Sequence, residues 1–242
     1  MRGTWIIFRR EVGQYLVSPV AYLIAAAFLF LTSFLFNNDL VTSVTVKPAS
    51  PAVIPIFLSF ALVFFAPVLT MRMLAEERRE GTLELLLTAP VRDSDIVIGK
   101  FLGAWFYYSV LLMLTLSYQF VLISVTQPDL GHAICAYIGI WLYGGATLAV
   151  GLFFSAITEN QIVAAFLSTA ALLVLYLGGL AGQIVANIEL ARLINQLTLQ
   201  GHFISSFAYG LLRAEDVAYF AGIVAVMLFI TIRVVESHRW RA

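Results

Sequence analysis

Residues 54–70 read IPIFLSFALVFFAPVLT and contain no charged side chain. A helix that crosses the hydrocarbon core of a bilayer needs roughly 20 predominantly apolar residues, so this stretch predicts a transmembrane helix. The rest of the chain has the same character, because 61% of its 242 residues are hydrophobic and 12% are charged. Soluble domains are about 45–50% apolar and about 25% charged. A soluble fold could not bury this apolar excess, so the composition predicts an integral membrane protein.

Five further stretches resemble the first in length and polarity. The predicted spans are residues 20–36, 54–70, 101–125, 133–156, 162–180 and 217–235. The third apolar pattern begins earlier, at about Asp95, so its first turns are expected in the cytoplasm or the interface. The first span follows basic residues, as in a signal peptide, but Phe34-Leu35-Phe36 at its end is not a small-residue cleavage site. We therefore expect an uncleaved, all-α protein with six transmembrane helices in a single domain, 1–242.

The basic residues are distributed unevenly between the two sides of the membrane that these spans define. With the N-terminus inside, eleven of the 14 Lys and Arg residues lie in cytoplasmic segments, and Lys47, Arg192 and Arg213 lie outside. Basic residues favour the cytoplasmic side, so we expect both termini in the cytoplasm. The formal net charge of zero gives no indication of nucleic-acid binding, and the single cysteine, Cys135, excludes an intramolecular disulfide.

The N-terminal stretch, residues 1–19, predicts an amphipathic helix in the headgroup region. Its apolar residues share one helical face: Trp5, Phe8, Val12, Tyr15 and Leu16. Its polar residues fall elsewhere: Arg9, Arg10, Glu11 and Gln14. Ser18-Pro19 separates it from the first span, since proline suits the first turn of a helix. The helix is either a topogenic anchor or an elbow that transmits movement into the first span.

The cytoplasmic loop at residues 72–100 predicts two short helices. Residues 71–80 favour a helix that Gly81 ends, and Thr82 can cap a second helix by accepting a backbone N–H. Pro90 forbids continuation of that second helix. It carries an apolar face opposite Glu84: Leu83, Leu86 and Leu87. These leucines are covered either by the membrane surface or the chain's own helices, or by a groove on a soluble partner.

Two further polar segments connect the later spans. The cytoplasmic turn at residues 158–161, TENQ, is either a plain hairpin or a second contact with the same partner. The outside segment at residues 181–216 has no charge run, and we expect it to fold back against the outer membrane surface rather than form a domain. Its apolar face consists of Leu190, Leu193, Ile194 and Leu197.

Several kinds of chemistry find no support in the sequence. It contains no G-x-x-x-x-G-K-[ST] motif, so we expect no binding of ATP by a P-loop. No Asp, Glu or Lys lies deep in a predicted span, as an ion-coupled carrier requires, and no internal repeat is visible. The three histidines lie outside the predicted spans, which argues against a haem or metal site there. We expect no catalytic, cofactor-binding or metal-binding residue, and an energy source on a partner.

The loop sequence EERREGTLELLLTAPV at residues 76–91, followed by GKFLG at 99–103, resembles the permease subunit of ABC-2 type transporters. It is most similar to the small bacterial branch that includes the gliding-motility permease and the nitrous-oxide-reductase accessory permease. Three other pieces agree with the family pattern: the elbow residues Glu11, Tyr15, Ser18 and Pro19, the turn NQIVA at 160–164, and the late outside residues His202, Phe203, Phe207 and Gly210.

The resemblance implies a type V exporter-like permease in the bacterial cytoplasmic (inner) membrane. It implies residues that couple to an ATPase: Glu76, Glu77, Arg78, Glu80, Gly81, Thr82, Leu83, Glu84, Leu86, Leu87, Pro90, Glu159, Asn160 and Gln161. It implies an elbow helix with Arg10, Glu11, Tyr15 and Pro19. The partners would be two ABC ATPase chains, which bind ATP and Mg, and a second permease chain in a homodimer or heterodimer. An additional membrane or periplasmic subunit is allowed, and no cargo is indicated.

Two functions from other classes stay open at this point. A membrane scaffold that anchors a soluble complex shares these features but needs no ATPase. An ion-coupled secondary carrier would need a titratable residue inside the membrane, and uptake driven by a pH or sodium gradient without ATP would support it. Co-purification of an ATPase whose hydrolysis this chain stimulates would distinguish the permease from the scaffold.

The distribution of basic residues gives a testable topology. In a Cys135→Ala background, a membrane-impermeant thiol reagent added from outside is expected to label cysteines introduced near Lys47 and Asn195, and to leave a cysteine near Arg79 unlabelled. Labelling near Arg79 in sealed cells would overturn the orientation, and labelling there after permeabilisation serves as the control for reactivity.

Overall fold

The computed structural model describes residues 2–45, 50–82, 91–125, 128–184, 189 and 196–239, and every regular element in these ranges is helical. The helices are α1 (Arg2–Val17), α2 (Pro19–Thr45), α3 (Val53–Thr70), α4 (Ala75–Arg79), α6 (Asp93–Val125), α7 (Leu130–Ile157), α8 (Gln161–Ile184), α10 (Leu199–Ser205), the 3-10 helix η1 (Phe207–Tyr209) and α11 (Ala214–Arg239). Six of them, α2, α3, α6, α7, α8 and α11, are long and apolar enough to cross a membrane, which confirms the predicted all-α fold with six spans.

The first span is longer than its apolar run. The sequence predicts a helix over 20–36, whereas α2 continues through Asn37, Asn38 and Asp39 to Thr45. These polar residues end the hydrophobic run but do not break the helix, since the Thr42 hydroxyl donates to the carbonyls of Asn38 and Asp39 and no proline or glycine intervenes. Apolarity therefore marks where the helix leaves the hydrocarbon core and not where the helix ends.

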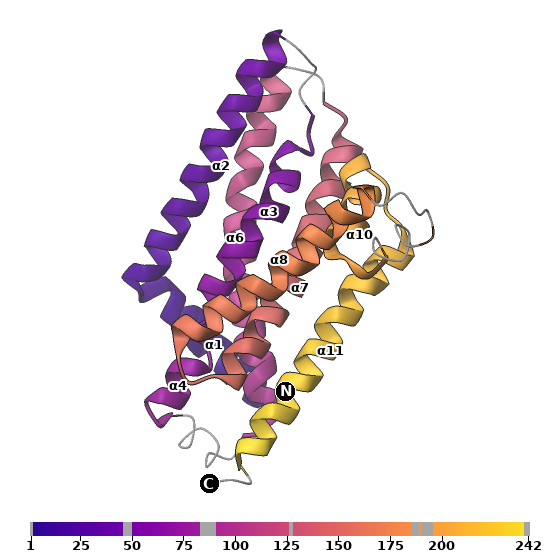
Figure 1. Cartoon of the computed structure of the whole chain (residues 1–242). Coiled ribbons are helices and arrows are strands. Elements are labelled where there is room, and N and C mark those ends of the chain that lie inside the picture. The colour runs from indigo at the N-terminus through magenta and orange to yellow at the C-terminus, as the bar shows by residue number, and fades with distance from the viewer. Residues whose placement is uncertain are drawn as a thin grey trace.

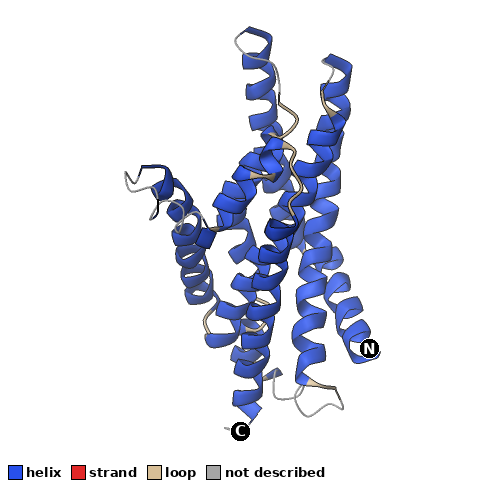
Figure 2. Cartoon of the chain, turned by 90° about the vertical axis from the view of Figure 1, so that its right-hand side faces the viewer, coloured by secondary structure: helices blue, strands red, loops and turns tan. Residues whose placement is uncertain are grey.

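The helices form an elongated bundle in which both ends of the chain lie at the same end. The N- and C-termini lie near α1 and α4 at the lower end of the bundle in Figure 1, and Figure 2 gives the same placement after a quarter turn. The short α10 lies toward the opposite end, beside the start of α11. An even number of spans returns the chain to the end of the bundle at which it began. The short helices α1 and α4 lie at this same end.

Helix α7 is the centre of the bundle. In its most apolar window 72% of the residues are buried, against 11% for the corresponding window of α11. It contacts α3, α6, α8 and α11, and its buried residues include many small ones, among them Gly139, Gly144 and Gly151. Four of the other long helices, α3, α6, α8 and α11, thus pack on α7, whereas α2 packs on α3 and α6.

Glycines on α7 allow this close packing. A Cβ added at Gly144 would lie 2.2 Å from the ring of Tyr108 on α6, and one at Gly151 would lie 2.2 Å from the hydroxyl of Thr70 on α3. In lipid the apolar tails offer helices no hydrophobic reason to associate, so their association depends on close van der Waals packing at small residues. The glycines therefore set how closely α3 and α6 approach α7.

The outside segment packs on the helices as far as the structure describes it. Phe203 and Phe207 are fully buried, and Phe207 lies so close to Gly139 of α7 that a Cβ there would be 2.4 Å away. Gly210 has φ +78°, a left-handed conformation that lets the chain turn between η1 and α11. Residues 196–213 thus pack against the protein's own helices; of the predicted apolar face, Leu190, Leu193 and Ile194 lie outside the described residues, and Leu197 is exposed.

Substitution of Gly144 tests the packing on α7. Gly144→Ala is expected to destabilise the folded protein by about 1–3 kcal/mol, because the new methyl group meets Tyr108, which is fully buried and donates to the Ile140 carbonyl. Gly222→Ala on α11 is the matched control, since a Cβ there meets nothing within 4 Å. It is expected to be neutral or stabilising by up to about 1 kcal/mol. Thermal unfolding in detergent would measure both, and equal effects would contradict this account.

Candidate functional site

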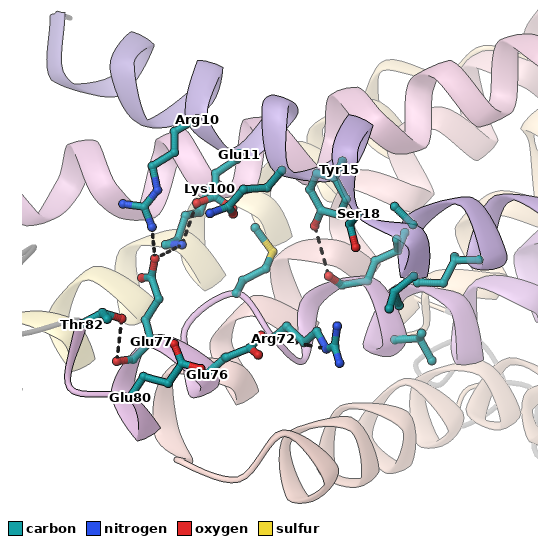
Figure 3. A pocket seen from close by; sticks show the side chains of 17 residues that line it. Arg10, Glu11, Tyr15, Ser18, Arg72, Glu76, Glu77, Glu80, Thr82 and Lys100 are labelled. Atoms are coloured by element: carbon teal, nitrogen blue, oxygen red, sulfur yellow. Dashed lines mark hydrogen bonds and ion pairs between the residues drawn. The ribbon is translucent and has the colours of Figure 1, made fainter.

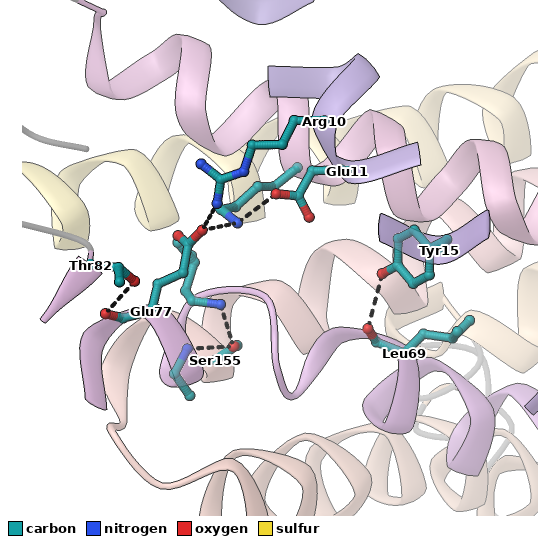
Figure 4. Close-up of polar contacts among 10 residues, drawn as sticks. Arg10, Glu11, Tyr15, Leu69, Glu77, Thr82 and Ser155 are labelled. Atoms are coloured by element: carbon teal, nitrogen blue, oxygen red, sulfur yellow. Dashed lines mark hydrogen bonds and ion pairs between the residues drawn. The ribbon is translucent and has the colours of Figure 1, made fainter. Parts of the chain in front are cut away.

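Three charged side chains from distant parts of the sequence meet at the end of the bundle that carries the termini. The Lys100 ammonium on α6 lies 2.8 Å from the Glu11 carboxylate on α1 and 2.9 Å from the Glu77 carboxylate on α4. Arg10 of α1 approaches the same Glu77 oxygen at 2.5 Å (Figure 4). We call these four residues the charge cluster, and it links the N-terminal helix, the cytoplasmic loop and the third long helix.

Because these charged side chains are largely buried, each of them needs a partner of opposite charge. The side chains of Lys100 and Glu11 are 2% and 5% exposed, and that of Glu77 is 12% exposed. A buried charge without a partner is strongly unfavourable, and removing one member of a buried pair typically costs about 3–5 kcal/mol. Two cations and two carboxylates balance one another here, so the cluster is neutral as a whole while each member depends on the others.

Two glycines of α6 bring α1 close enough to complete the cluster. A Cβ at Gly99 would lie 2.7 Å from the Ile7 side chain, and one at Gly103 would lie 2.7 Å from Glu11. This G-x-x-x-G spacing forms a shallow face on α6, on which α1 lies across its length. The sequence analysis used Lys100 as a cytoplasmic basic residue and as part of the GKFLG piece of the family resemblance, and it assigned Lys100 no partner, although the glycines four residues apart around it indicate close helix packing.

The predicted amphipathic helix is present as α1, but its buried side differs from the expected apolar face. Trp5 and Leu16 are 63% and 60% exposed, whereas Ile7 and Glu11 are buried. The sequence placed Glu11 on the polar face, and this placement is corrected here: Glu11 points inward because Lys100 supplies its counter-charge. Periodicity alone cannot identify a buried carboxylate whose partner is 89 residues away.

Tyr15 fastens the end of α1 to the end of α3. Its hydroxyl donates to the Leu69 carbonyl at 3.2 Å, and since α3 ends at Thr70 this carbonyl is among those without a partner inside the helix. Burial, and after it the nearby Glu11, raises the pKa of Tyr15 well above its ordinary value, so the phenol keeps its proton and remains a donor. Ser18 and then Pro19 follow, where α1 ends and α2 begins.

The short helix α4 has its N-terminus capped by a residue of α7. The Ser155 hydroxyl accepts from the backbone N–H groups of Leu74 and Ala75, each at 3.1 Å, and donates to the Met71 carbonyl. The sequence predicted one helix over 71–80, but residues 71–74 form a turn and α4 spans Ala75–Arg79. A surrogate cap from another helix could not be recognised from local sequence.

After α4 the chain turns at Gly81, whose φ of +70° fits the predicted helix end. The Thr82 hydroxyl donates back to the Glu77 carbonyl at 3.2 Å rather than capping a following turn in the described residues. The remainder of the predicted second helix lies outside the described residues: Leu83, Glu84, Leu86, Leu87 and Pro90. The leucine face therefore stays a prediction.

The turn at residues 158–161 lies against α4. Arg78 bonds the Glu159 carboxylate at 3.0 Å and the Ile157 carbonyl at 3.2 Å, and Arg72 donates to the Gln161 side chain at 3.3 Å. Asn160 accepts the N–H of Ile162 through its side chain, next to the start of α8. The structure thus brings together the two cytoplasmic segments that the sequence singled out separately.

A cavity of about 340 Å³ opens beside the charge cluster, between α1, the start of α2, the end of α3 and α4 (Figure 3). Its polar lining includes Arg10, Glu11, Gln14, Tyr15, Ser18, Arg72, Glu76, Glu77, Glu80, Thr82 and Lys100. The second carboxylate oxygen of Glu77 is buried there without a hydrogen-bond partner. This space leaves room for α4 to shift relative to α1.

The four outside residues that the sequence singled out lie apart from this site. His202 contacts the Asp216 carboxylate through Nδ1 and the Gln196 carbonyl through Nε2, and its ring stacks on Tyr219 with the centroids 3.8 Å apart. Together with the buried Phe203 and Phe207 and the turn at Gly210, these contacts hold α10 and η1 against α7 and α11.

The chain matches the family described as ABC-2 family transporter protein over residues 7–234. The match begins in α1 and ends in α11, so it includes the charge cluster, the described loop residues and the six long helices. A comparison with curated proteins gives no match.

The charge cluster predicts a large effect of removing its central cation. Lys100→Met is expected to destabilise the protein by about 3–5 kcal/mol, because it leaves Glu11 and Glu77 facing each other in a buried site. Adding Glu11→Gln to this variant is expected to recover part of the loss. The measurement is thermal or denaturant unfolding in detergent for the single and double variants. If the two changes are additive, Lys100 and Glu11 do not interact as described.

Proposed function

Because the chain belongs to the ABC-2 family of transporter proteins, we propose that this multi-pass membrane permease works with a separate ABC ATPase to export a substrate across the cytoplasmic membrane. The ATPase would bind at the end of the bundle that carries α1 and α4. Both termini would then face the cytoplasm, in agreement with the distribution of basic residues. Export, and the small permease branch named above, rest on the sequence resemblance.

The observation that carries this proposal is the linkage of the cytoplasmic loop to several long helices at once. Glu77 of α4 reaches α6 through Lys100 and α1 through Arg10. Ser155 of α7 holds the start of α4, and Arg78 holds the turn before α8. A movement that a soluble partner imposes on this loop would therefore be transmitted to α1, α6, α7 and α8. A coupling element needs this property.

The mechanism follows from these contacts as a two-state shift. Two ATPase chains would close on binding ATP and Mg, and this closure would move the loop that includes residues 83–90. Helix α4 is short and borders the cavity, so it can move relative to α1 while Glu77 remains paired with Lys100 or Arg10. The movement would pass through α1 and Tyr15 to the junction of α1 and α2 and to the end of α3.

Two permease chains would enclose the path, either as a homodimer or as a heterodimer. Support for an additional chain comes from the exposed apolar surface of the outer helices: in the most apolar windows of α8 and α11, 17% and 11% of the residues are buried. Lipid covers whatever part of this surface a second chain does not. The present chain would supply no ATP-binding residue, and the substrate class is left unassigned.

The leucines of the loop provide a test of the docking site. A Leu83→Ala, Leu86→Ala double variant is expected to weaken ATPase binding at least tenfold, because truncating a buried leucine costs about 2–5 kcal/mol where a cavity remains and about 1.4 kcal/mol is one decade. Leu212→Ala, at an exposed leucine near the start of α11, is the matched control and is expected to leave binding unchanged. Affinity for the co-expressed ATPase and thermal stability are measured on the same purified variants.

The outcomes separate the proposal from its rivals. Weakened binding with retained stability supports docking by the leucine face, whereas unchanged binding with lost stability means that these leucines cover the chain's own helices. ATPase hydrolysis that rises when the permease is added supports transport, and a purified chain that hydrolyses ATP by itself would refute the assignment. Stable binding of a soluble complex without any stimulated hydrolysis would favour the scaffold.

A further inference from the structure

An apolar groove of about 530 Å³ runs between α1, α6 and α7, on a side of α1 away from the charge cluster. Aromatic side chains dominate its lining: Trp5, Phe8, Trp105, Phe106 and Trp141. The rings of Trp105 and Trp141 stack with their centroids 4.3 Å apart, and Phe8 meets Phe106 edge to face. The groove thus has a rigid aromatic wall that is open to the surroundings of the bundle.

A second apolar groove of about 510 Å³ continues the first along α6 and α7. Ser109 and Trp141 line both grooves, so the two are joined at these residues. From Leu102 in the first groove to Ile123 at the far end of the second, α6 rises about 31 Å at about 1.5 Å per residue. This is about the full thickness of a hydrocarbon core of about 30 Å, so the part of the joined groove next to α1 corresponds to one leaflet.

The polar side chains of the wall at Trp105, Ser109 and Trp141 are already paired within the protein, whereas the Gln119 side-chain oxygen, farther along the second groove, has no hydrogen-bond partner among the described residues. The Trp141 indole N–H donates to the Ser109 hydroxyl at 2.8 Å, and the Trp105 indole N–H donates to the Trp141 carbonyl. The Ser109 hydroxyl in turn donates to the Trp105 carbonyl. A polar partner would find no free group on this wall between Trp105 and Trp141, whereas a hydrocarbon chain can lie on it without leaving a donor or acceptor unpaired.

A cation lies one helical turn along α1 from the groove. Arg9 is exposed and lies four residues after Trp5, so it neighbours this lining residue on the surface of α1. In the part of the chain that the structure describes, Arg9 forms no ion pair. An arginine in this position suits a phosphate, since the guanidinium binds phosphate oxygens through paired N–H donors.

We propose that this groove is a binding site for an anionic phospholipid of the leaflet in which α1 lies. Arg9 faces the net negative charge of the headgroup, which a zwitterionic lipid lacks, and one acyl chain lies over Trp105 and Trp141 and continues into the groove between α6 and α7. The bound lipid fills the apolar surface between α1 and the bundle. The site is independent of the coupling function, because it shares no residue with the charge cluster.

Quenching of tryptophan fluorescence by brominated lipids tests the proposal directly. In a Trp240→Phe variant the remaining tryptophans, Trp5, Trp105 and Trp141, all line the groove. The protein is reconstituted in vesicles that contain brominated phosphatidylglycerol or brominated phosphatidylcholine at equal mole fraction. Relative binding constants from the quenching curves are expected to favour the anionic lipid about fivefold, the effect of one basic residue at a membrane surface.

Matched arginine variants complete the experiment. Arg9→Gln is expected to bring the preference close to one without changing quenching by the zwitterionic lipid, and Arg79→Gln, at another exposed arginine, is expected to keep the full preference. Equal quenching by both lipids in the starting protein would overturn the proposal, as would a preference that survives Arg9→Gln. Failure of either brominated lipid to quench would mean that protein, such as a second copy, covers the groove.

Discussion

The ammonium group of Lys100 lies between the carboxylates of Glu11 and Glu77, and Glu11 could not remain buried without it. Helix α1, the loop after α3 and helix α6 are therefore held at one point, although the sequence separates Glu11 from Lys100 by 89 residues. A hydrophobic contact at this place would allow the three elements to slide past one another. Charge pairing at short range instead keeps the three elements in contact, while the cavity beside α4 leaves room for a shift in which Glu77 stays paired.

The rest of the bundle depends on a second constraint, the small residues of α7. Gly139, Gly144 and Gly151 face Phe207, Tyr108 and Thr70, each at a distance that leaves no space for a methyl group. These contacts are distributed along the middle of α7, so the helix serves as a common support for α3, α6 and η1. The charge cluster fixes the cytoplasmic-loop end of the molecule, while the α7 glycines fix its interior.

Much of this architecture can be predicted from the sequence, because bilayer thickness and hydrophobicity determine where a span lies. The six spans were found in this way, and the loop residues were recognised from their resemblance to a family. The helix α2 continues for nine residues beyond Phe36, where the predicted span ends, since helix continuation does not depend on apolarity. Local sequence patterns also could not predict that Glu11 is buried or that Ser155 caps α4. The burial of Glu11 depends on Lys100, and Ser155 acts on a helix 80 residues earlier in the chain.

The capping of α4 by Ser155 has a consequence for the order in which the protein is assembled. Ribosomes add about 5–20 residues per second, so the serine that accepts the first α4 amides is synthesised roughly 4–16 s after α4 itself. During that interval these backbone amides must be hydrated, and the loop has no fixed attachment to α7. The end of the molecule that carries α1 and α4 is thus completed late, after the fourth span has been synthesised. A half-synthesised chain would carry α4 without its cap, and under the proposed function a partner ATPase would meet a complete docking loop only once α7 exists.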